Sequence, residues 1–248
     1  MPNRTLVTGG ARGVGAAIVR ALAEAGHDVA FTYRSSAEAA TALAGELRTG
    51  GRTVAAHSLD LSDRTAVDAF CERLADETFF GLVHSAGQPY DALAAVMAQD
   101  KAEAAMQVNL WSFTRLAKAL LPGMIRARAG RIVAIGSVAA SRGSPGNAAY
   151  AASKGALAAY CRTLAVETAR RGVTVNVVAP GFVDTAMMAP YAAHRAEMER
   201  QIPAGRFARP EEIAALVRFL FTECSGYITG AILPVDGGLT ATLGVQRA

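Results

Sequence analysis

Short runs rich in β-branched residues alternate along this chain with longer Ala- and Leu-rich stretches whose charges recur at helical spacing. This alternation is typical of βαβ units, and it continues to the end without a repeat or a linker. We therefore expect one α/β domain over residues 1–248, with a doubly wound parallel sheet of about seven strands and helices on both faces. The expected strands are Arg4–Thr8, Asp28–Tyr33, Thr53–Ser58, Gly81–Ser85, Gly130–Ile135, Val173–Val178 and Ala231–Val235. The expected helices are Val14–Ala25, Ala37–Leu47, Arg64–Glu77, Lys101–Arg128, Tyr150–Arg171 and Pro210–Thr222.

Composition excludes several classes of protein. Hydrophobic residues make up 52% of the 248 residues and charged residues 19%, which argues against a disordered chain. The formal charge is +4, and the basic residues are spread along the chain, so the sequence favours small anions or an acidic partner over nucleic acid.

The three cysteines, Cys71, Cys161 and Cys224, lie far apart and outside any C-x-x-C spacing, so neither a disulfide framework nor a metal site is expected. Strand-like residues from Arg4 onward leave no room for a signal segment, and no apolar run reaches the ~18 residues that span a bilayer. We expect a cytoplasmic protein with no membrane and no nucleic-acid partner.

A glycine-rich turn, Thr8–Gly15, follows the first expected strand and opens the first expected helix. Gly9, Gly13 and Gly15 fall where the backbone must turn tightly and approach a ligand. The free N–H groups and positive end of such a helix bind a pyrophosphate. A tight turn that merely needs positive φ is the alternative, but the position between strand and helix favours a dinucleotide.

The end of the second expected strand distinguishes NAD from NADP. An NAD site usually holds a carboxylate there, whereas this chain has Tyr33-Arg34-Ser35-Ser36. Arg34, together with Arg12, can pair with a 2′-phosphate, although Arg34 could also be a solvated residue at a strand end. The sequence therefore favours NADP(H).

Tyr150 and Lys154 lie one helical turn apart, so a phenol and an ammonium share one helix face. We expect the ammonium to lower the phenol's pKa and allow proton exchange with an alcohol or carbonyl. Ser137 follows the fifth expected strand, at the sheet edge where ligands bind, and its hydroxyl can hold a substrate oxygen.

The chain resembles the classical short-chain dehydrogenases/reductases over essentially its whole length, and within them the 3-oxoacyl-acyl-carrier-protein reductases. The family's motifs are matched by Thr8–Gly15, by the tetrad Asn109, Ser137, Tyr150 and Lys154, and by Pro180–Thr185. The nearer resemblance depends on Ile202–Phe207, Arg209–Ile213 and Tyr227–Gly230 leading to Val235–Gly238.

The resemblance implies a Rossmann-type fold and reduction of a ketone by NADPH, in which Tyr150 donates a proton and Ser137 holds the oxygen. Lys154 would lower the pKa of Tyr150, and Asn109 would hold a water that resupplies the proton. The implied cofactor-binding residues are Gly9, Ala11, Arg12, Gly13, Val14, Gly15, Arg34, Asp60, Leu61, Ser85, Ala86, Gly87, Tyr150, Lys154, Pro180, Gly181, Val183 and Thr185.

The resemblance also implies partners. Arg128 and Arg171 match positions where carrier-protein reductases present basic side chains beside the active-site mouth, so they would dock an acidic acyl carrier protein; ordinary surface arginines are the alternative. Small residues along the Tyr150 helix fit the family's homotetramer, although a dimer or close packing on the chain's own sheet stays open.

The irregular stretch at about residues 184–207 is expected to be a substrate lid. Its Met187, Met188 and Tyr191 either cover an acyl chain or pack the lid on the body.

One departure from the family is His84-Ser85, where most relatives have Asn-Asn. We interpret His84 as a partly buried, satisfied histidine rather than a catalytic base. The role of the tail Leu239–Ala248 stays open.

Two other functions stay open. One is a dehydrogenase of the same fold that acts on an acyl-CoA, a small alcohol or a sugar. The other is a non-catalytic NADP(H)-binding sensor or scaffold.

Overall fold

The computed structural model describes residues 3–49, 52–74 and 77–242, which form one seven-stranded parallel sheet. The strand order is β3-β2-β1-β4-β5-β6-β7, so the chain crosses from one edge back to the middle between β3 and β4. The strands are β1 Arg4–Thr8, β2 Asp28–Tyr33, β3 Val54–Ser58, β4 Gly81–His84, β5 Gly130–Ile135, β6 Val173–Pro180 and β7 Ile232–Val235.

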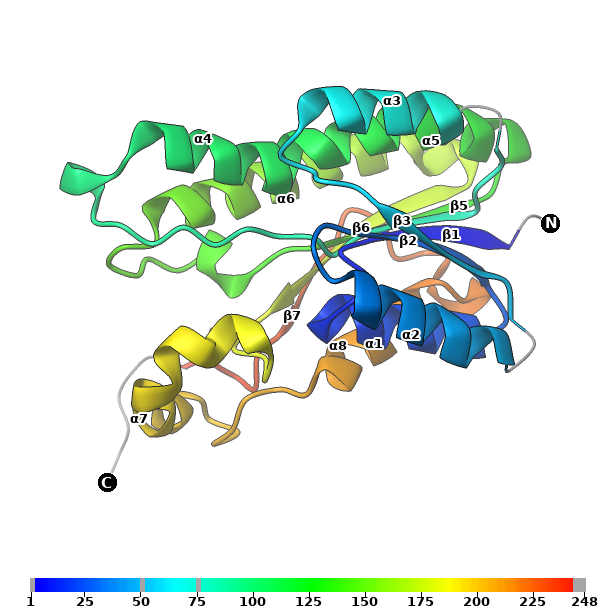
Figure 1. Ribbon diagram of the computed structural model, residues 1–248. Coiled ribbons are helices and arrows are strands. Elements are labelled where there is room, and N and C mark those ends of the chain that lie inside the picture. The colour runs from blue at the N-terminus through cyan, green and yellow to red at the C-terminus, as the bar shows by residue number, and fades with distance from the viewer. Residues whose placement is uncertain (1–2, 50–51, 75–76, 243–248) are drawn as a thin grey trace.

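Helices cover both faces of the sheet, as Figure 1 shows, with α3 to α6 on one side and α1, α2 and α8 on the other. The helices are α1 Gly13–Glu24, α2 Ala37–Thr49, α3 Arg64–Leu74, α4 Gln99–Met106, α5 Ser112–Ala127, α6 Ala148–Thr168, α7 Arg195–Gln201 and α8 Pro210–Leu220. The doubly wound fold expected from the sequence is confirmed.

Neighbouring residues of each central strand point to opposite faces, and this alternation divides the core in two. On β1, Leu6 packs with the helices of the α5 side, whereas Val7 packs with those of the α1 side. Leu82 and Val83 on β4 repeat the division. Both faces of the sheet are therefore buried, which is why its strands are continuously apolar.

The prediction of one continuous helix over Lys101–Arg128 is wrong, because the middle of this stretch is not α-helical. A π-helical segment, Gln107–Trp111, separates α4 from α5, and Asn109 lies at its centre. The hydrogen-bond ladder there spans one more residue than an α-helix, so helical periodicity on either side did not reveal it.

The remaining differences lie at element ends and in the lid. The tail of the expected helix Tyr150–Arg171 is a 3-10 turn, Ala169–Arg171, and the irregular stretch contains a 3-10 segment, Ala186–His194, followed by α7. Residues 75–76 of the expected helix Arg64–Glu77 and residues 243–248 of the tail lie outside the described residues.

Candidate active site

The carboxyl ends of the central strands bring the expected site residues to one edge of the sheet. Ser137 follows β5, and residues 85–87 follow β4, which adjoins β1 and the glycine turn. The sheet order reverses between β1 and β4, and open α/β sheets bind ligands at such a switch point.

The glycine turn is built so that no side chain fits in its interior. Gly9 and Gly13 have φ values of 67° and 52°, in the left-handed region. A Cβ on Gly15 would lie 2.1 Å from the carbonyl oxygen of Gly9. Helix α1 begins at Gly13, and Arg12, its N-cap residue, makes no side-chain capping hydrogen bond. The first turn of the helix has no acidic residue. Its free N–H groups and positive dipole therefore suit a pyrophosphate.

Two further loops flank this turn. The Ala86 N–H donates to the Thr8 hydroxyl at 3.1 Å, so the loop after β4 lies against the end of β1. A Cβ on Gly13 would lie 3.2 Å from the Thr185 methyl carbon, so the loop after β6 approaches from the other side. The expected cofactor residues 85–87 and 180–185 are thus brought next to the glycine turn.

The expected adenosine-side residues also lie near one another. Arg12 and Arg34 are exposed, and Leu61 is buried. Burial raises the pKa of Asp60, but hydrogen bonds from Ser62 and the nearby Arg34 charge outweigh it and lower that pKa. The residue that follows β2 is Arg34 and not a carboxylate, so an exposed positive charge stands where it can meet a phosphate.

The serine, tyrosine and lysine of the expected tetrad lie together at this edge of the sheet. The Ser137 hydroxyl lies close enough to the Tyr150 hydroxyl to lower its pKa by a hydrogen-bonding interaction. The Lys154 ammonium lies 5.7 Å from the centre of the Tyr150 ring and donates to the Ile135 carbonyl at 2.8 Å. A Cβ on Gly87 would lie 3.4 Å from the same nitrogen, so a glycine leaves room for a ligand beside it.

The electrostatics of this pair differ from the expectation. Burial raises the pKa of Tyr150, the hydrogen bond with Ser137 lowers it, and the Asp91 charge raises it further, so the net shift is upward. Burial also lowers the pKa of Lys154 to about 8. The expected lowering of the phenol's pKa by Lys154 is therefore wrong in the protein without cofactor, because desolvation is the largest effect on both groups.

Asn109 is fixed at the centre of the π segment by three hydrogen bonds of its side chain. Its amide nitrogen donates to the Gln88 carbonyl at 3.1 Å and to the Ser153 hydroxyl at 2.8 Å. Its oxygen accepts the Gln88 N–H at 2.7 Å, and Ser153 donates in turn to the Tyr150 carbonyl. Both N–H groups of the amide are used, so a water could bind this side chain only by donating to the second lone pair of its oxygen.

The sequence analysis missed Gln88, Ser153 and Asp91 as members of the site. Ser153 directly precedes Lys154 on the catalytic helix, which was an available signal. Gln88 and Asp91 carry no local signal, because their roles depend on contacts with residues far along the chain.

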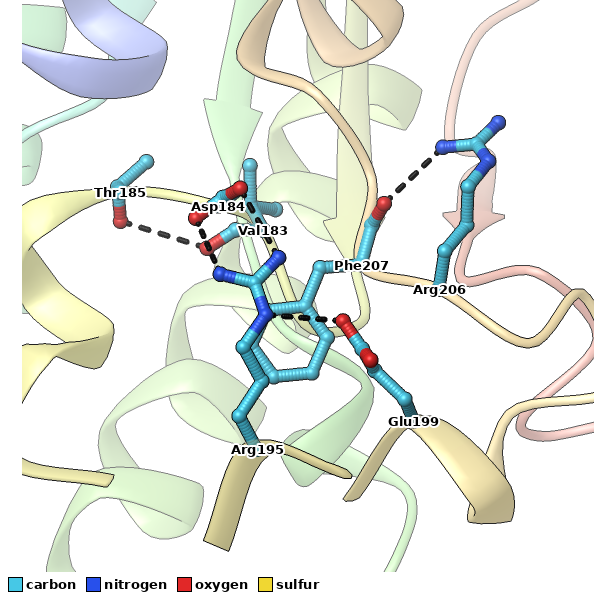
Figure 2. Close-up of polar contacts among 7 residues, drawn as sticks. All are labelled: Val183, Asp184, Thr185, Arg195, Glu199, Arg206 and Phe207. Atoms are coloured by element: carbon cyan, nitrogen blue, oxygen red, sulfur yellow. Dashed lines mark hydrogen bonds and ion pairs between the residues drawn. The ribbon is translucent and has the colours of Figure 1, made fainter. Parts of the chain in front are cut away.

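The segment expected to be a lid is fastened by charged contacts, shown in Figure 2. Arg195 at the start of α7 forms a bidentate ion pair with Asp184 at 2.9 and 3.0 Å and also binds Glu199 at 2.9 Å. Its guanidinium stacks on the Phe207 ring at 4.7 Å. Asp184 adjoins Thr185, so these contacts join the lid helix to the loop expected to hold the nicotinamide end of a cofactor.

Arg128 and Arg171 lie together but away from the tetrad. Each lies two residues before the first residue of a strand, β5 or β6, so both are at the amino edge of the sheet, opposite Ser137. Arg128 donates to the Arg170 carbonyl at 3.3 Å. Within one chain, Arg128 and Arg171 therefore do not lie beside the active-site mouth, as the resemblance had led us to expect.

The residues that the structure describes offer neither a metal site nor a membrane-spanning helix. They contain no group of three or more His, Cys, Asp or Glu side chains able to hold a metal ion. Within the same residues no helix has the length and apolar character to cross a membrane.

A helix start open to a pyrophosphate, next to a phenol able to exchange a proton, is typical of a dinucleotide-dependent oxidoreductase. Residues 9–240 match the sequence profile of the family described as enoyl-(acyl carrier protein) reductase. The 3-oxoacyl-[acyl-carrier-protein] reductases FabG of Vibrio cholerae and Escherichia coli are 41% and 39% identical, each over 94% of this chain and 96% of the relative.

Solved structures agree. A blue fluorescent protein from a metagenomic library, in complex with NADPH, superposes with a TM-score of 0.90 at 37% identity over 96% of this chain and 97% of its own. A putative NAD(P)-dependent gluconate 5-dehydrogenase from Beutenbergia cavernae, with bound NADP, gives 0.92 at 36% identity over 97% of both chains. This chain belongs to the short-chain dehydrogenase/reductase family.

Proposed function

We propose that this protein reduces a 3-oxoacyl thioester, carried on acyl carrier protein, to the 3-hydroxyacyl thioester with NADPH. The observation that carries the proposal is the proximity of the Ser137 and Tyr150 hydroxyls beside the buried Lys154, at the sheet edge that holds the glycine turn. The similarity to 3-oxoacyl reductases over 94% of the chain supports the substrate class.

NADPH, when bound, would supply a hydride to the ketone carbon, and the chain's own residues supply the proton. Ser137 and Tyr150 hold the ketone oxygen through their hydroxyls, and Tyr150 gives its proton to that oxygen as the negative charge develops. The carbonyl bond becomes a single C–O bond, and the products are the alcohol and the oxidised cofactor. A phenol whose pKa is raised is still neutral at physiological pH and able to donate.

Lys154 and Asn109 return the proton to Tyr150 after each turnover. A lysine whose pKa is about 8 exchanges protons with solvent near neutral pH. Asn109 holds Gln88 and Ser153 in place next to this ammonium. Because both N–H groups of its side chain are used, a relay water would bind the amide oxygen or the main chain of the π segment.

NADPH rather than NADH is favoured by the charges at the adenosine end. Arg12, in the glycine turn, and Arg34 are both exposed. Arg34 stands directly after β2, where a carboxylate would favour NADH. Arg34→Glu should raise the KM for NADPH at least tenfold and change that for NADH little, because a carboxylate repels the 2′-phosphate. An equal rise for both cofactors would contradict the assignment.

Docking of an acidic carrier protein is proposed at the basic pair Arg128 and Arg171. Because both residues lie at the amino edge of the sheet, docking there serves the active site of a neighbouring copy of the chain. The proposal therefore requires an oligomer. Arg128→Glu and Arg171→Glu should weaken carrier-protein binding, whereas Arg52→Glu, on the loop before β3, should not.

A homotetramer, or failing that a dimer, is proposed through α6. Its Ala152 and Ala159 are exposed, and a Cβ on Gly155 would meet nothing within 4 Å. Val166 on the same helix is 81% exposed. Such an open row of small and apolar residues permits close helix packing between copies. A cytoplasmic location and a substrate lid at about residues 184–207 complete the proposal.

The deciding experiment compares NADPH oxidation with acetoacetyl-carrier protein, acetoacetyl-CoA and a keto sugar acid. The likeness to a putative gluconate dehydrogenase makes the last substrate a necessary comparison. We expect the highest kcat/KM with the carrier-protein substrate and loss of turnover in Tyr150→Phe. If the wild type binds NADPH but reduces none of the ketones, a non-catalytic sensor or scaffold becomes the better interpretation.

A further inference from the structure

His84, the last residue of β4, is fully buried next to the candidate site and is not used in the proposed chemistry. Its ring packs against Phe113 with the ring centres 5.3 Å apart. Nδ1 lies 3.0 Å from the Thr8 hydroxyl oxygen, whereas Nε2 has no well-formed hydrogen bond. The expected partly buried, satisfied histidine is therefore wrong on both points, and an orphaned buried nitrogen needs an explanation.

The hydrogen bond between Thr8 and Nδ1 indicates which ring nitrogen of His84 carries the proton. The Thr8 oxygen already accepts the Ala86 N–H at 3.1 Å, and the hydroxyl also contacts His84 Nδ1 at 3.0 Å. A hydroxyl that accepts one hydrogen bond and donates another uses both of its roles, so this arrangement favours Thr8 as the donor to Nδ1. A nitrogen that accepts a hydrogen bond carries no proton, so in the neutral ring the proton lies on Nε2.

The groups on the Nε2 side of the ring also favour a proton on Nε2. The backbone carbonyls of Val108 and Asn109, in the π segment, act on the imidazole as acceptors. Carbonyls cannot donate, so they favour an N–H directed at them. Neither is aligned closely enough with Nε2 for a full hydrogen bond, which makes the contact sensitive to small shifts of the π segment.

Charge keeps the ring neutral. Burial and the nearby Lys154 ammonium lower the pKa of His84 to about 3, although the two carbonyls oppose this. Besides Lys154, the groups around the ring are the neutral Thr8 hydroxyl and the Phe113 ring. His84 therefore does not act as an acid or a base at the pH of catalysis.

We infer that His84 is a positioning residue, held as the neutral Nε2–H tautomer, which connects the cofactor loop at Thr8 and Ala86 to the π segment that carries Asn109. Through this connection it holds Asn109 on Gln88 and Ser153 beside Lys154. The tautomer is independent of the proposed function, whereas the effect on turnover depends on it.

The tautomer is tested directly by two-dimensional NMR of the whole protein labelled with ¹⁵N-histidine. We expect one ring with Nδ1 unprotonated and Nε2 protonated, unchanged between pH 5 and 9, that is absent from the His84→Asn spectrum. Protonated Nδ1, or titration of this ring within that range, would overturn the inference whatever the enzyme's activity.

The positioning role is tested by two amides of different reach. In His84→Asn the amide replaces Nδ1 and can still meet Thr8, but it leaves the π segment without a donor. In His84→Gln the amide reaches the position of Nε2. We expect His84→Asn to lower kcat about tenfold with the NADPH dissociation constant within twofold, and His84→Gln to recover most of the loss.

His57→Asn on the edge strand β3 is the matched control, because it makes the same chemical change in a half-buried histidine away from the tetrad. Its kcat should equal that of the wild type. Equal losses in His84→Asn and His84→Gln would show that a donor at the Nε2 position does not account for the effect, and unchanged kcat in both would show no positioning; either result refutes the inference. Thermal unfolding of each variant separates loss of fold from loss of turnover.

Discussion

Replacing Lys154 with methionine should abolish turnover and, at neutral pH, stabilise the protein. Lys154 is 3% exposed, and burial lowers its pKa from 10.5 to about 8. At about 1.36 kcal/mol per pKa unit, holding the ammonium in the folded protein below pH 8 costs about 3 kcal/mol. Methionine has similar length and no charge, so it removes this cost.

The gain is partly offset because the Ile135 carbonyl loses its 2.8 Å hydrogen bond. An unsatisfied buried carbonyl costs about 1–3 kcal/mol, so the net stabilisation at pH 7 is about 1 kcal/mol.

The sign of the pH dependence is the sharper measurement. Below pH 8 both the folded and unfolded wild type carry the lysine proton, so its cost is constant. Between pH 8 and 10.5 the unfolded chain binds more protons than the folded one, and wild-type stability rises with pH. Lys154→Met lacks this rise. The free-energy advantage of the variant should therefore shrink by about 2 kcal/mol between pH 7 and 9.5 and change sign.

Urea unfolding of both proteins without cofactor, at one protein concentration and half-unit pH steps, measures this difference. Taking the difference cancels the tyrosines and the other groups that titrate in the same range. A difference in unfolding free energy that stays constant from pH 7 to 9.5 would refute the reasoning, because it would mean that Lys154 is not desolvated.

The other predictions concern single contacts. Gly15→Ala should abolish NADPH binding measured by fluorescence, because its Cβ would lie 2.1 Å from the Gly9 carbonyl oxygen; retained affinity would show that the glycine turn can open. Tyr191→Phe removes the lid's hydrogen bond to Asp91 and should raise the ketone KM about two- to tenfold with kcat unchanged, whereas a fall in kcat alone would contradict a lid role. Val166→Asp should lower the mass found by light scattering, and an unchanged mass would place the interface elsewhere.

Much of the fold could be predicted from the sequence because its signals are local. Arg4–Thr8 and Asp28–Tyr33 are strands with the expected ends, and the glycine turn lies where its position between strand and helix placed it. The position of Arg128 could also have been predicted. A residue just before a parallel strand lies at the amino edge of the sheet, and the site lies at the carboxyl edge.

What could not be predicted depends on distant contacts. The pKa of Tyr150 is raised rather than lowered because burial, which spacing along a helix does not reveal, outweighs the interaction with Ser137 and is reinforced by the Asp91 charge. The partners of Asn109 and the link between Asp91 and Tyr191 join segments far apart in the chain.

The π segment Gln107–Trp111 has a consequence for how the chain tolerates change in length. Loss of any one of its five residues would restore regular α-helical hydrogen bonding from α4 into α5. The same deletion would turn the preceding residues by about 100° around the helix axis relative to α5. A shortened chain would gain a more regular helix and lose the alignment of Asn109 with Gln88 and Ser153, so at this position good local geometry and catalysis are opposed.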